Sequence, residues 1–358
     1  MKLKQLFKFL NQFRSQPLAV FALLLIVLAV IFSDRFRPFV RHQEPDFLSF
    51  RELKILSKKP NPNWFLKSKL EKFWRTPLIS NDAYYQGVRP EPKKDPKLGS
   101  YLRIASWNIE KSIRIKEAVT LFSSKDGFLQ MLDPSEAPPG SGEMETVTRQ
   151  RDRLASADIL VLQEMDIGVK RSGYVHAAAE LAQALKMNYA YGAEQLEIDP
   201  VYLGTEQIYF SDGMVDQAAT DYYRVDPSRY KGVFGCAVLS RYPIKDVKVF
   251  QLQHQAYDWY RGEKPKIGFF EKARRVGAEI LFENELTREI KTGGRIYFRT
   301  DLAIPGLPEN TLTIINIHLE IKSLPKGREE QLAEILSYVR KIKHPVILMG
   351  ISIPHLRI

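Results

Sequence analysis

The sequence predicts an α/β fold from residue 99 onward, and two features indicate it. Short apolar runs without glycine or proline, such as 159–162, are typical of strands buried in a sheet. Between these runs lie segments with apolar residues at helical spacing, as in 144–156 and 177–187. Strands that alternate with helices in this way predict an α/β domain.

The run 159–162 is informative because polar side chains follow it directly. Gln163 and Glu164 come immediately after the apolar residues. Open α/β folds place ligand sites beyond the carboxyl ends of their strands, so Glu164 is a candidate functional carboxylate. The alternative is a solvated strand terminus, and this stretch alone does not separate the two.

A second strand is expected over 102–110 from the alternation of its side chains, and it contains Asn108 and Glu110 near its end. An amide and a carboxylate at the ends of neighbouring strands could present oxygen ligands to one divalent ion. Mg²⁺ uses one or two such groups and keeps water in its other positions. The two strand ends together therefore suggest a metal site.

A third apolar run, 311–319, ends in a polar cluster that contains His318. A lone histidine at a strand end is more often structural than catalytic, but two other polar-tipped strands precede it, which makes His318 a candidate. The tyrosine-rich stretch 188–230 shows few clear periods and is expected to form irregular loops. Further expectations are strands over 233–240, 275–280, 295–302 and 345–350, a hairpin turn over 291–294 and a helix over 327–342.

The net charge of +11 belongs to the first 98 residues, because residues 99–358 carry basic and acidic side chains in equal number. A nuclease usually needs a basic groove to meet phosphates, so this distribution disfavours one. The single cysteine, Cys236, excludes an intrachain disulfide and a cysteine-based zinc site.

The apolar run 18–32 follows four basic residues and contains no polar side chain. As a helix it would span about 23 Å, less than the ~30 Å hydrocarbon core. A signal peptide, a signal anchor and a buried helix are all compatible with it. The bulky residues after it offer no small-residue cleavage site, which favours an uncleaved single-pass anchor. The folded domain would then be extracytoplasmic, although basic residues on both sides specify the orientation weakly.

The segment 34–98 is basic and rich in proline, with aromatic residues such as Trp64 and Phe65 between the charges. Two interpretations stay open: an interfacial stretch on anionic lipid beside the anchor, or a solvated linker. The proline-rich run 89–96 is expected to be a semi-rigid spacer. The predicted organisation is a basic N-terminus with an anchor (1–33), a juxtamembrane segment (34–98) and a folded domain (99–358).

The polar-tipped strands, taken in order, resemble the motifs of the endonuclease/exonuclease/phosphatase superfamily. The resemblance covers most of 99–350 and none of 1–98. The matching pieces are Ser-Trp-Asn-Ile at 106–109, Leu-Gln-Glu at 162–164, Gly-Cys-Ala-Val-Leu-Ser-Arg at 235–241, and Asn-Ile-His-Leu at 316–319 followed by Arg328 and Gln331.

The resemblance implies a two-sheet α/β sandwich of the deoxyribonuclease-I-like type, with the site between the sheet rims. It also implies hydrolysis of a phosphoester that depends on Mg²⁺, with Mn²⁺ as an alternative. Glu164 would hold the metal, Asn108 would help to orient the metal or its waters, and His318 would bind phosphoryl oxygens and stabilise the transition state. Asp166 and Arg171 would contact the substrate or lie in a solvated loop.

One departure from the family pattern concerns the end of the sequence. The family places Gly-Asp-x-Asn after a strand like 346–350 and, later, an Asp-His pair that supplies a further catalytic histidine. Here Gly350 is followed by Ile-Ser-Ile-Pro-His-Leu-Arg-Ile, and neither motif occurs. The codons ATT-TCA-ATA-CCN, preceded by one G, read GAT-TTC-AAT-ACC, which encodes Asp-Phe-Asn-Thr. We therefore expect a one-nucleotide deletion after the Gly350 codon, a domain that is incomplete at its C-terminus, and an inactive product.

Together these patterns predict a membrane-anchored, Mg²⁺-dependent phosphoesterase whose partners are a phosphoester and the membrane. The alternatives are an endonuclease or exonuclease that acts on nucleic acid, and a catalytically inactive, truncated product. Phospholipids, inositol phosphates and sugar phosphates all stay open as substrates, a lipid-derived one included, and nucleic acid is less favoured.

Overall fold

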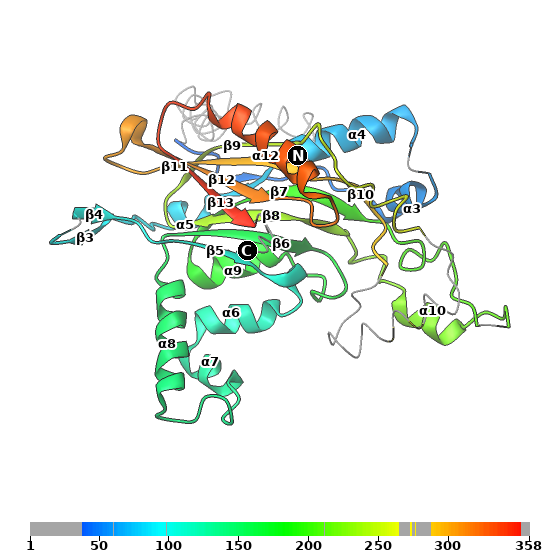
Figure 1. Cartoon of the computed structure of the whole chain (residues 1–358), viewed down its shortest axis with the longest axis horizontal. Coiled ribbons are helices and arrows are strands. Elements are labelled where there is room, and N and C mark those ends of the chain that lie inside the picture. Colours follow the sequence, from blue (N-terminus) through cyan, green and yellow to red (C-terminus); the bar gives the residue numbers. More distant parts are fainter. Residues whose placement is uncertain are drawn as a thin grey trace, which may run out of the picture.

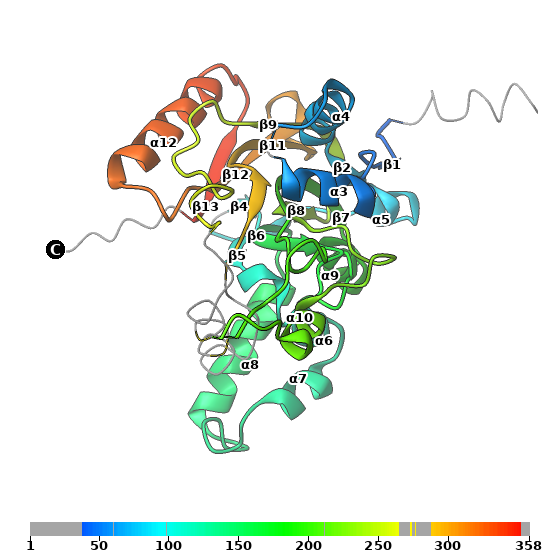
Figure 2. The same cartoon turned by 90° about the vertical axis from the view of Figure 1, so that its right-hand side faces the viewer.

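The structure, a computed structural model, describes residues 38–351 except 60, 98, 211 and most of 265–287, where only Ala273 and Val276 are described. Two sheets are stacked on each other, with helices on both outer faces (Figures 1 and 2). The layers therefore run helix, sheet, sheet, helix. The predicted α/β fold with two sheets is confirmed.

The larger sheet has seven strands in the part of the chain that the structure describes. Their spatial order is β1 (His42–Gln43), β2 (Leu78–Ser80), β7 (Asn188–Glu197), β8 (Val233–Ser240), β6 (Ile159–Ile167) and β5 (Ile104–Asn108), with β10 (Lys291–Gly293) paired to β7. β5 and β6 are parallel, and the other neighbours are antiparallel. β7 and β8 are buried along their whole lengths, because helices cover one face of the sheet and the second sheet covers the other.

The smaller sheet has the order β13 (Val346–Ile351), β12 (Thr311–His318), β11 (Ile296–Ala303) and β9 (Ile244–Gln251) among the described residues, with β12 and β13 parallel. Val161 and Val238 of the larger sheet meet Phe298 and Ile314 of the smaller one in a shared apolar core. At Gly192 the sheets approach so closely that a Cβ atom would lie 2.9 Å from Ile296 Cδ1. A larger residue there would force the side chains of Ile296, Val249 and Phe298 to shift, so glycine lets the two sheets pack at this distance.

Helices complete the outer layers. α9 (Ala177–Leu185) packs on the outer face of the larger sheet, and α6 (Ile115–Ser123) packs against α9. α12 (Pro325–Val339) covers the outer face of the smaller sheet. The other described helices are α3 (Phe50–Lys58), α4 (Trp64–Arg75), α5 (Asp82–Tyr85), α7 (Lys125–Met131), α8 (Gly142–Ala155) and α10 (Gln217–Tyr223), with 3₁₀ turns η2 (Glu110–Ser112) and η3 (Pro308–Asn310).

Two predictions about local structure are wrong. The stretch 188–230 is not irregular throughout, because its first ten residues form β7. A strand buried on both faces shows no polar alternation, which hid it in the sequence. The expected hairpin turn at 291–294 is largely the short strand β10, which pairs with β7. The expected strand 275–280 lies outside the described residues, apart from Val276, which is helical.

Part of the segment 34–98, expected to be a linker or an interfacial stretch, belongs to the folded core. β2 pairs with β7 of the larger sheet, and Leu53, Leu56 and Phe73 from α3 and α4 are buried in its core. The expected spacer 89–96 contains β3 (Lys93–Asp95), which pairs with β4 (Gly99–Tyr101) as a separate arm. Lys93 Nζ also lies 2.9 Å from the carboxylate of Asp158.

The apolar run 18–32 lies outside the described residues. Among the helices that the structure describes, none is long and apolar enough to cross a bilayer.

Candidate functional site

Glu164 lies on a bulge inside β6. Its φ is +59°, and the pairing of β6 with β8 shifts register between Leu162 and Met165. A left-handed residue at this point takes Glu164 out of the ladder and turns its side chain out of the alternation of the strand. The expectation that the strand ends at Gln163 and Glu164 is therefore wrong, since β6 continues to Ile167.

Asn108, at the end of β5, holds the Glu164 carboxylate. Its Nδ2 donates to Glu164 Oε1 at 2.9 Å, and its Oδ1 accepts from the backbone N–H of Glu110 at 2.9 Å. Residues 110–112 also have positive φ, between 50° and 55°, and this turn wraps around the bulge. Ser112 Oγ donates to the Glu164 carbonyl at 3.3 Å and accepts from the Asp166 N–H at 3.1 Å. The turn and the bulge thus fix each other.

His318, the last residue of β12, brings the smaller sheet to the same place. Its Nε2 lies 3.7 Å from Glu164 Oε1, and its Nδ1 lies 2.9 Å from Glu194 Oε2. The buried amide of Asn316, two residues earlier, donates to the carbonyls of Leu162 and Ala237 at 2.9 and 3.0 Å. These bonds tie β12 to β6 and β8. The structure therefore brings together Asn108, Glu164 and His318, the three residues that the strand ends predicted.

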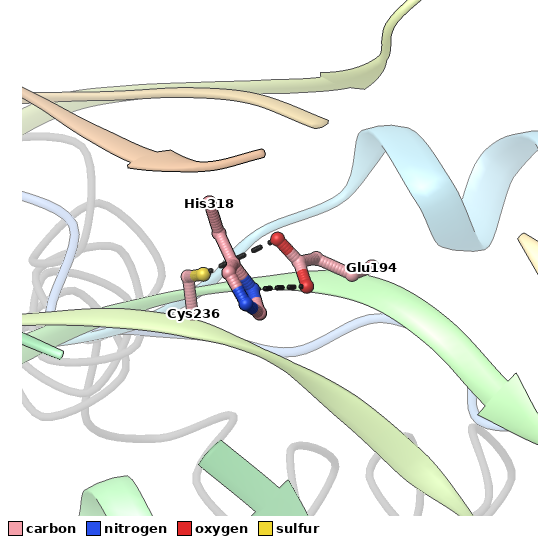
Figure 3. Close-up of side chains that lie close together, drawn as sticks. All are labelled: Glu194, Cys236 and His318. Carbon is pink, nitrogen blue, oxygen red and sulfur yellow. Dashed lines mark hydrogen bonds and ion pairs between the residues drawn. The ribbon is translucent and has the colours of Figure 1, made fainter. Parts of the chain in front are cut away.

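Glu194 and Cys236 lie on either side of the His318 ring in a buried cluster that the sequence analysis missed (Figure 3). Glu194 of β7 accepts from Cys236 Sγ at 3.3 Å through Oε1 and from Arg295 Nη1 at 3.0 Å through Oε2. Arg295 Nε also donates to Glu320 at 3.2 Å. The signal that could have found Glu194 is a carboxylate within an otherwise uncharged run, 188–196.

Partner charges set the ionisation of these groups. Burial raises the pKa of Glu164, but the hydrogen bond and charge of His318 and the amide of Asn108 outweigh it and lower that pKa to about 2. Burial and the Arg295 charge lower the pKa of His318, but the carboxylates of Glu194 and Glu164 outweigh them, so the His318 pKa is raised. The two carboxylates therefore favour the protonated form of His318, whereas the Arg295 guanidinium, with Nη1 2.7 Å from His318 Nδ1, opposes it.

Asp166 and Arg171 form a second buried cluster instead of the solvated loop that the sequence left open. Arg171 Nη2 lies 2.7 Å from Asp166 Oδ1, and its two terminal nitrogens pair with the Glu197 carboxylate at 2.8 and 2.9 Å. Asp166 is fully buried. Both side chains are thus engaged with protein partners in the core.

Two lysines add positive charge between the clusters, and sequence reasoning missed both. Lys291 Nζ lies 2.7 Å from Glu289 Oε2 and over the ring of Phe234, 4.5 Å from its centroid. Lys111 contacts the same Glu289. Burial lowers the pKa of Lys111 to about 7, and the charges of Lys291 and Arg171 act in the same direction. The Lys111 charge reaches Glu164 and helps to keep it ionised.

The geometry allows Glu164 to act as a ligand. Its side chain is 22% exposed, and Oε2 makes no hydrogen bond to any residue within the described ranges. One oxygen is therefore held by Asn108 while the other is open to solvent. An open carboxylate beside His318 and within reach of the Lys111 charge suits a divalent cation together with an anion.

A second group of metal-type donors lies deeper. Ligand atoms of Glu194, Cys236 and His318 lie within 4.8 Å of one another. All three are buried, and Glu194 already neutralises the guanidinium of Arg295. Another cation would be repelled by Arg295 there, so we assign this cluster to the floor of the site.

Comparison with known proteins adds a family match. A sequence model of the Endonuclease/Exonuclease/phosphatase family matches residues 105–350. Among solved structures, the chain is similar to an endonuclease/exonuclease/phosphatase from Beutenbergia cavernae DSM 12333, at 14% identity and a TM-score of 0.33 over 69% of this chain and 46% of that one. It is also similar to a protein of that family from Leptotrichia buccalis C-1013-b, at 10% identity and a TM-score of 0.26 over 70% of this chain and 66% of that one. The chain thus spans about half to two thirds of these proteins. No curated protein matches the sequence.

Proposed function

This chain belongs to the endonuclease/exonuclease/phosphatase family, and from that membership and the geometry around Glu164 we propose that its site is that of a Mg²⁺-dependent phosphoester hydrolase. Membership implies a metal-dependent phosphoesterase in general terms. The observation that carries the finer proposal is the ionised Glu164 carboxylate, with one oxygen held by Asn108 and the other free.

Glu164 would hold Mg²⁺, or Mn²⁺, through its free oxygen. A hard cation that keeps water in most of its positions fits a site with one open carboxylate. Asn108 acts on this ligand by fixing its orientation, because its amide nitrogen faces Glu164 and its oxygen is engaged by Glu110. When bound, the metal would neutralise charge on the phosphate.

His318 would bind the phosphoryl oxygens. Glu194 Oε2 lies 2.9 Å from its Nδ1, and its Nε2 faces Glu164 Oε1 at 3.7 Å, with Arg295 Nη1 3.2 Å from the same nitrogen. A preorganised imidazolium N–H is a strong donor to oxygens on which negative charge grows. Lys111 and Lys291 would add to the attraction for the anion. We assign Arg171 and Asp166 a supporting part, since they fix Glu197, which lies 3.6 Å from Lys291 Nζ.

Location and substrate complete the proposal. The run 18–32 would anchor the chain in a membrane as a single pass, with the domain extracytoplasmic. The basic character of the first 98 residues supports a substrate at an anionic membrane surface. A lipid-derived phosphoester is therefore the preferred class, ahead of nucleic acid.

Metal binding is a sharper first test than turnover, because the Asp-x-Asn and Asp-His motifs of the family do not occur in the 358 residues. We expect the purified chain to bind Mn²⁺, observed by electron paramagnetic resonance, and Mg²⁺ to compete for the site. Glu164→Gln should remove this binding. Glu329→Gln, which alters an exposed carboxylate on α12, should leave it unchanged.

The anion is tested on the same samples. Inorganic phosphate should raise the unfolding temperature of the metal-loaded chain, and His318→Gln should weaken this effect. A chain that binds no Mn²⁺ contradicts the proposal. Binding that survives Glu164→Gln would place the metal elsewhere, and tight, salt-sensitive binding of DNA would favour a nuclease instead.

A further inference from the structure

Two aromatic side chains stand out from the surface at the connection between α3 and α4. Trp64 and Phe65 are 69% and 68% exposed. Their rings stack on each other, with centroids 4.0 Å apart. We call the described residues from 54 to 69 the α3–α4 tip. Exposed apolar side chains that form a contiguous patch rimmed by polar residues mark interaction surfaces, so the stacked pair is a candidate for one.

The exposure of Trp64 and Phe65 follows from an ordered first turn of α4 and does not result from a frayed helix end. Asn63 caps α4, since its side chain accepts from the Leu66 N–H at 3.1 Å. Leu66, on the opposite face, is buried in the core. Lys69 Nζ lies 3.0 Å from Glu52 and joins α4 to α3. The first turn of α4 is therefore fixed with Trp64 and Phe65 facing outward.

The charged side chains of residues 53–70, which include the aromatic pair, have one sign. Residues 53–70 include five lysines and no acidic residue. Lys58, Lys59 and Lys67 are exposed, and none forms an ion pair with a described residue. Aromatic rings with unpaired cations beside them match the headgroup region of an anionic bilayer, where rings sit among the headgroups and lysines meet lipid phosphates.

A second apolar group lies at the same end of the molecule. Tyr209, Phe210 and Met214 are exposed in the loop before α10. Ser57 Oγ lies 3.3 Å from Thr205 Oγ1, which links the end of α3 to the start of this loop. α3, α4 and α10 all lie on the right in Figure 1 and face the viewer in Figure 2, opposite the β3–β4 arm.

We propose that the α3–α4 tip docks on an anionic bilayer, with Trp64 and Phe65 among the headgroups and Lys58, Lys59 and Lys67 against lipid phosphates. A bilayer fits better than a protein partner because lysine is depleted in protein interfaces, whereas here lysines surround the aromatic pair. This docking involves neither the Glu164 site nor the run 18–32. It does not depend on the proposed hydrolysis, although residues 54–69 belong to the basic first 98 residues that support the proposed membrane location.

The test uses the full chain and the fluorescence of Trp64. All four tryptophans are described, and Trp64 alone is exposed, so the spectrum of the wild type minus that of Trp64→Phe isolates its emission. Vesicles of phosphatidylcholine and phosphatidylserine carry a brominated phosphatidylcholine, and iodide is the aqueous quencher. We expect Trp64 emission to shift to the blue, to be quenched by the bromolipid and to become protected from iodide. This readout reports the tip even where another segment also holds the chain on the vesicle.

Matched charge variants complete the experiment. Lys58→Gln with Lys59→Gln should lower the affinity of the tip for the vesicles about 5-fold per lysine, measured as the lipid concentration that gives half-maximal bromolipid quenching of Trp64. Lys94→Gln with Lys97→Gln, exposed on the β3–β4 arm, makes the same charge change at the opposite end and should have no effect. Three results would overturn the proposal: iodide access to Trp64 that vesicles do not change, protection without vesicles, which indicates a protein cover, or equal loss in both double variants.

Discussion

Glu164 and Glu194 are both carboxylates of the larger sheet, and both lie against His318, yet their surroundings differ. Glu194 is 1% exposed, and its two oxygens are engaged by Cys236, Arg295 and His318. Glu164 is 22% exposed, and only Oε1 has a partner among the described residues. The number of partners separates a buried counter-ion from a carboxylate that is free to take a ligand.

The energetics follow from the same difference. Burial raises the pKa of Glu194, but the charges of His318 and Arg295 outweigh it and lower that pKa. Its charge is thus bound to two buried cations, and removing it leaves them uncompensated. The Glu164 carboxylate has fewer partners inside the protein. Its loss should therefore reduce the affinity for a ligand more than it reduces the free energy of unfolding.

The largest effect is expected from Glu194→Ala. Among the described residues, the variant leaves buried Arg295 with Glu320 as its single carboxylate partner, and breaking one side of a buried pair costs about 3–5 kcal/mol of unfolding free energy. Denaturant unfolding followed by circular dichroism measures it, with Glu164→Gln as the paired variant. A loss below about 1 kcal/mol would show that Glu194 is not the counter-ion of the floor.

The next effect concerns added metal. At 100 times its dissociation constant, Mg²⁺ should stabilise the wild type by about 2.7 kcal/mol, because it binds the folded chain only. Glu164→Gln should lose this stabilisation while its metal-free stability stays within about 1 kcal/mol of the wild type. Calorimetric unfolding with and without Mg²⁺ tests both parts. If Mg²⁺ still stabilises the Glu164→Gln variant, Glu164 is not the carboxylate that binds the metal.

His176 shows what burial does to an ionisable group that has no counter-charge. Burial and the Lys231 charge lower its pKa to about 3, whereas the unfolded chain takes up the proton near pH 6.5. Its contribution to stability is complete above about pH 6.5 and falls by about 1.4 kcal/mol per pH unit as the pH drops toward 3. His176→Asn keeps an N-cap acceptor for Ala179 and removes the titration. The wild type should lose stability relative to this variant between pH 6.5 and 5, and equal pH dependence of the two proteins would contradict the assignment.

The smallest effect is expected from Asn108→Ala. Removing the donor that orients Glu164 should weaken Mn²⁺ binding about 10-fold without abolishing it, as for other groups that orient a metal ligand. Asn61→Ala, an exposed amide far along the chain, serves as the control. Complete loss of binding would make Asn108 a direct ligand.

The sequence predicts three residues of the site because each lies near the end of an apolar run, and such a run indicates a buried strand from local sequence alone. These residues are Asn108, Glu164 and His318. Glu194 and Arg295 could not be predicted, since they are 101 residues apart and meet only when β7 and β11 stack. The β7 strand lacks polar alternation because both of its faces are covered, so its carboxylate gave no periodic signal. The sequence did not predict that residues 42–85 pack into the core of the larger sheet, because their exposed faces are basic and resemble a linker in composition.

The left-handed bulge at Glu164 has a consequence for how this sequence responds to selection. A residue with a Cβ atom holds φ near +59° at a cost of roughly 1 kcal/mol, which glycine avoids and asparagine reduces. Selection for thermal stability thus favours glycine or asparagine at position 164, whereas selection for the proposed metal binding favours glutamate. A library selected only for thermal survival should accumulate glycine or asparagine there, and a lineage released from its function should drift the same way. Retention of glutamate at this bulge in such a library or lineage would therefore support the metal binding that we propose for Glu164.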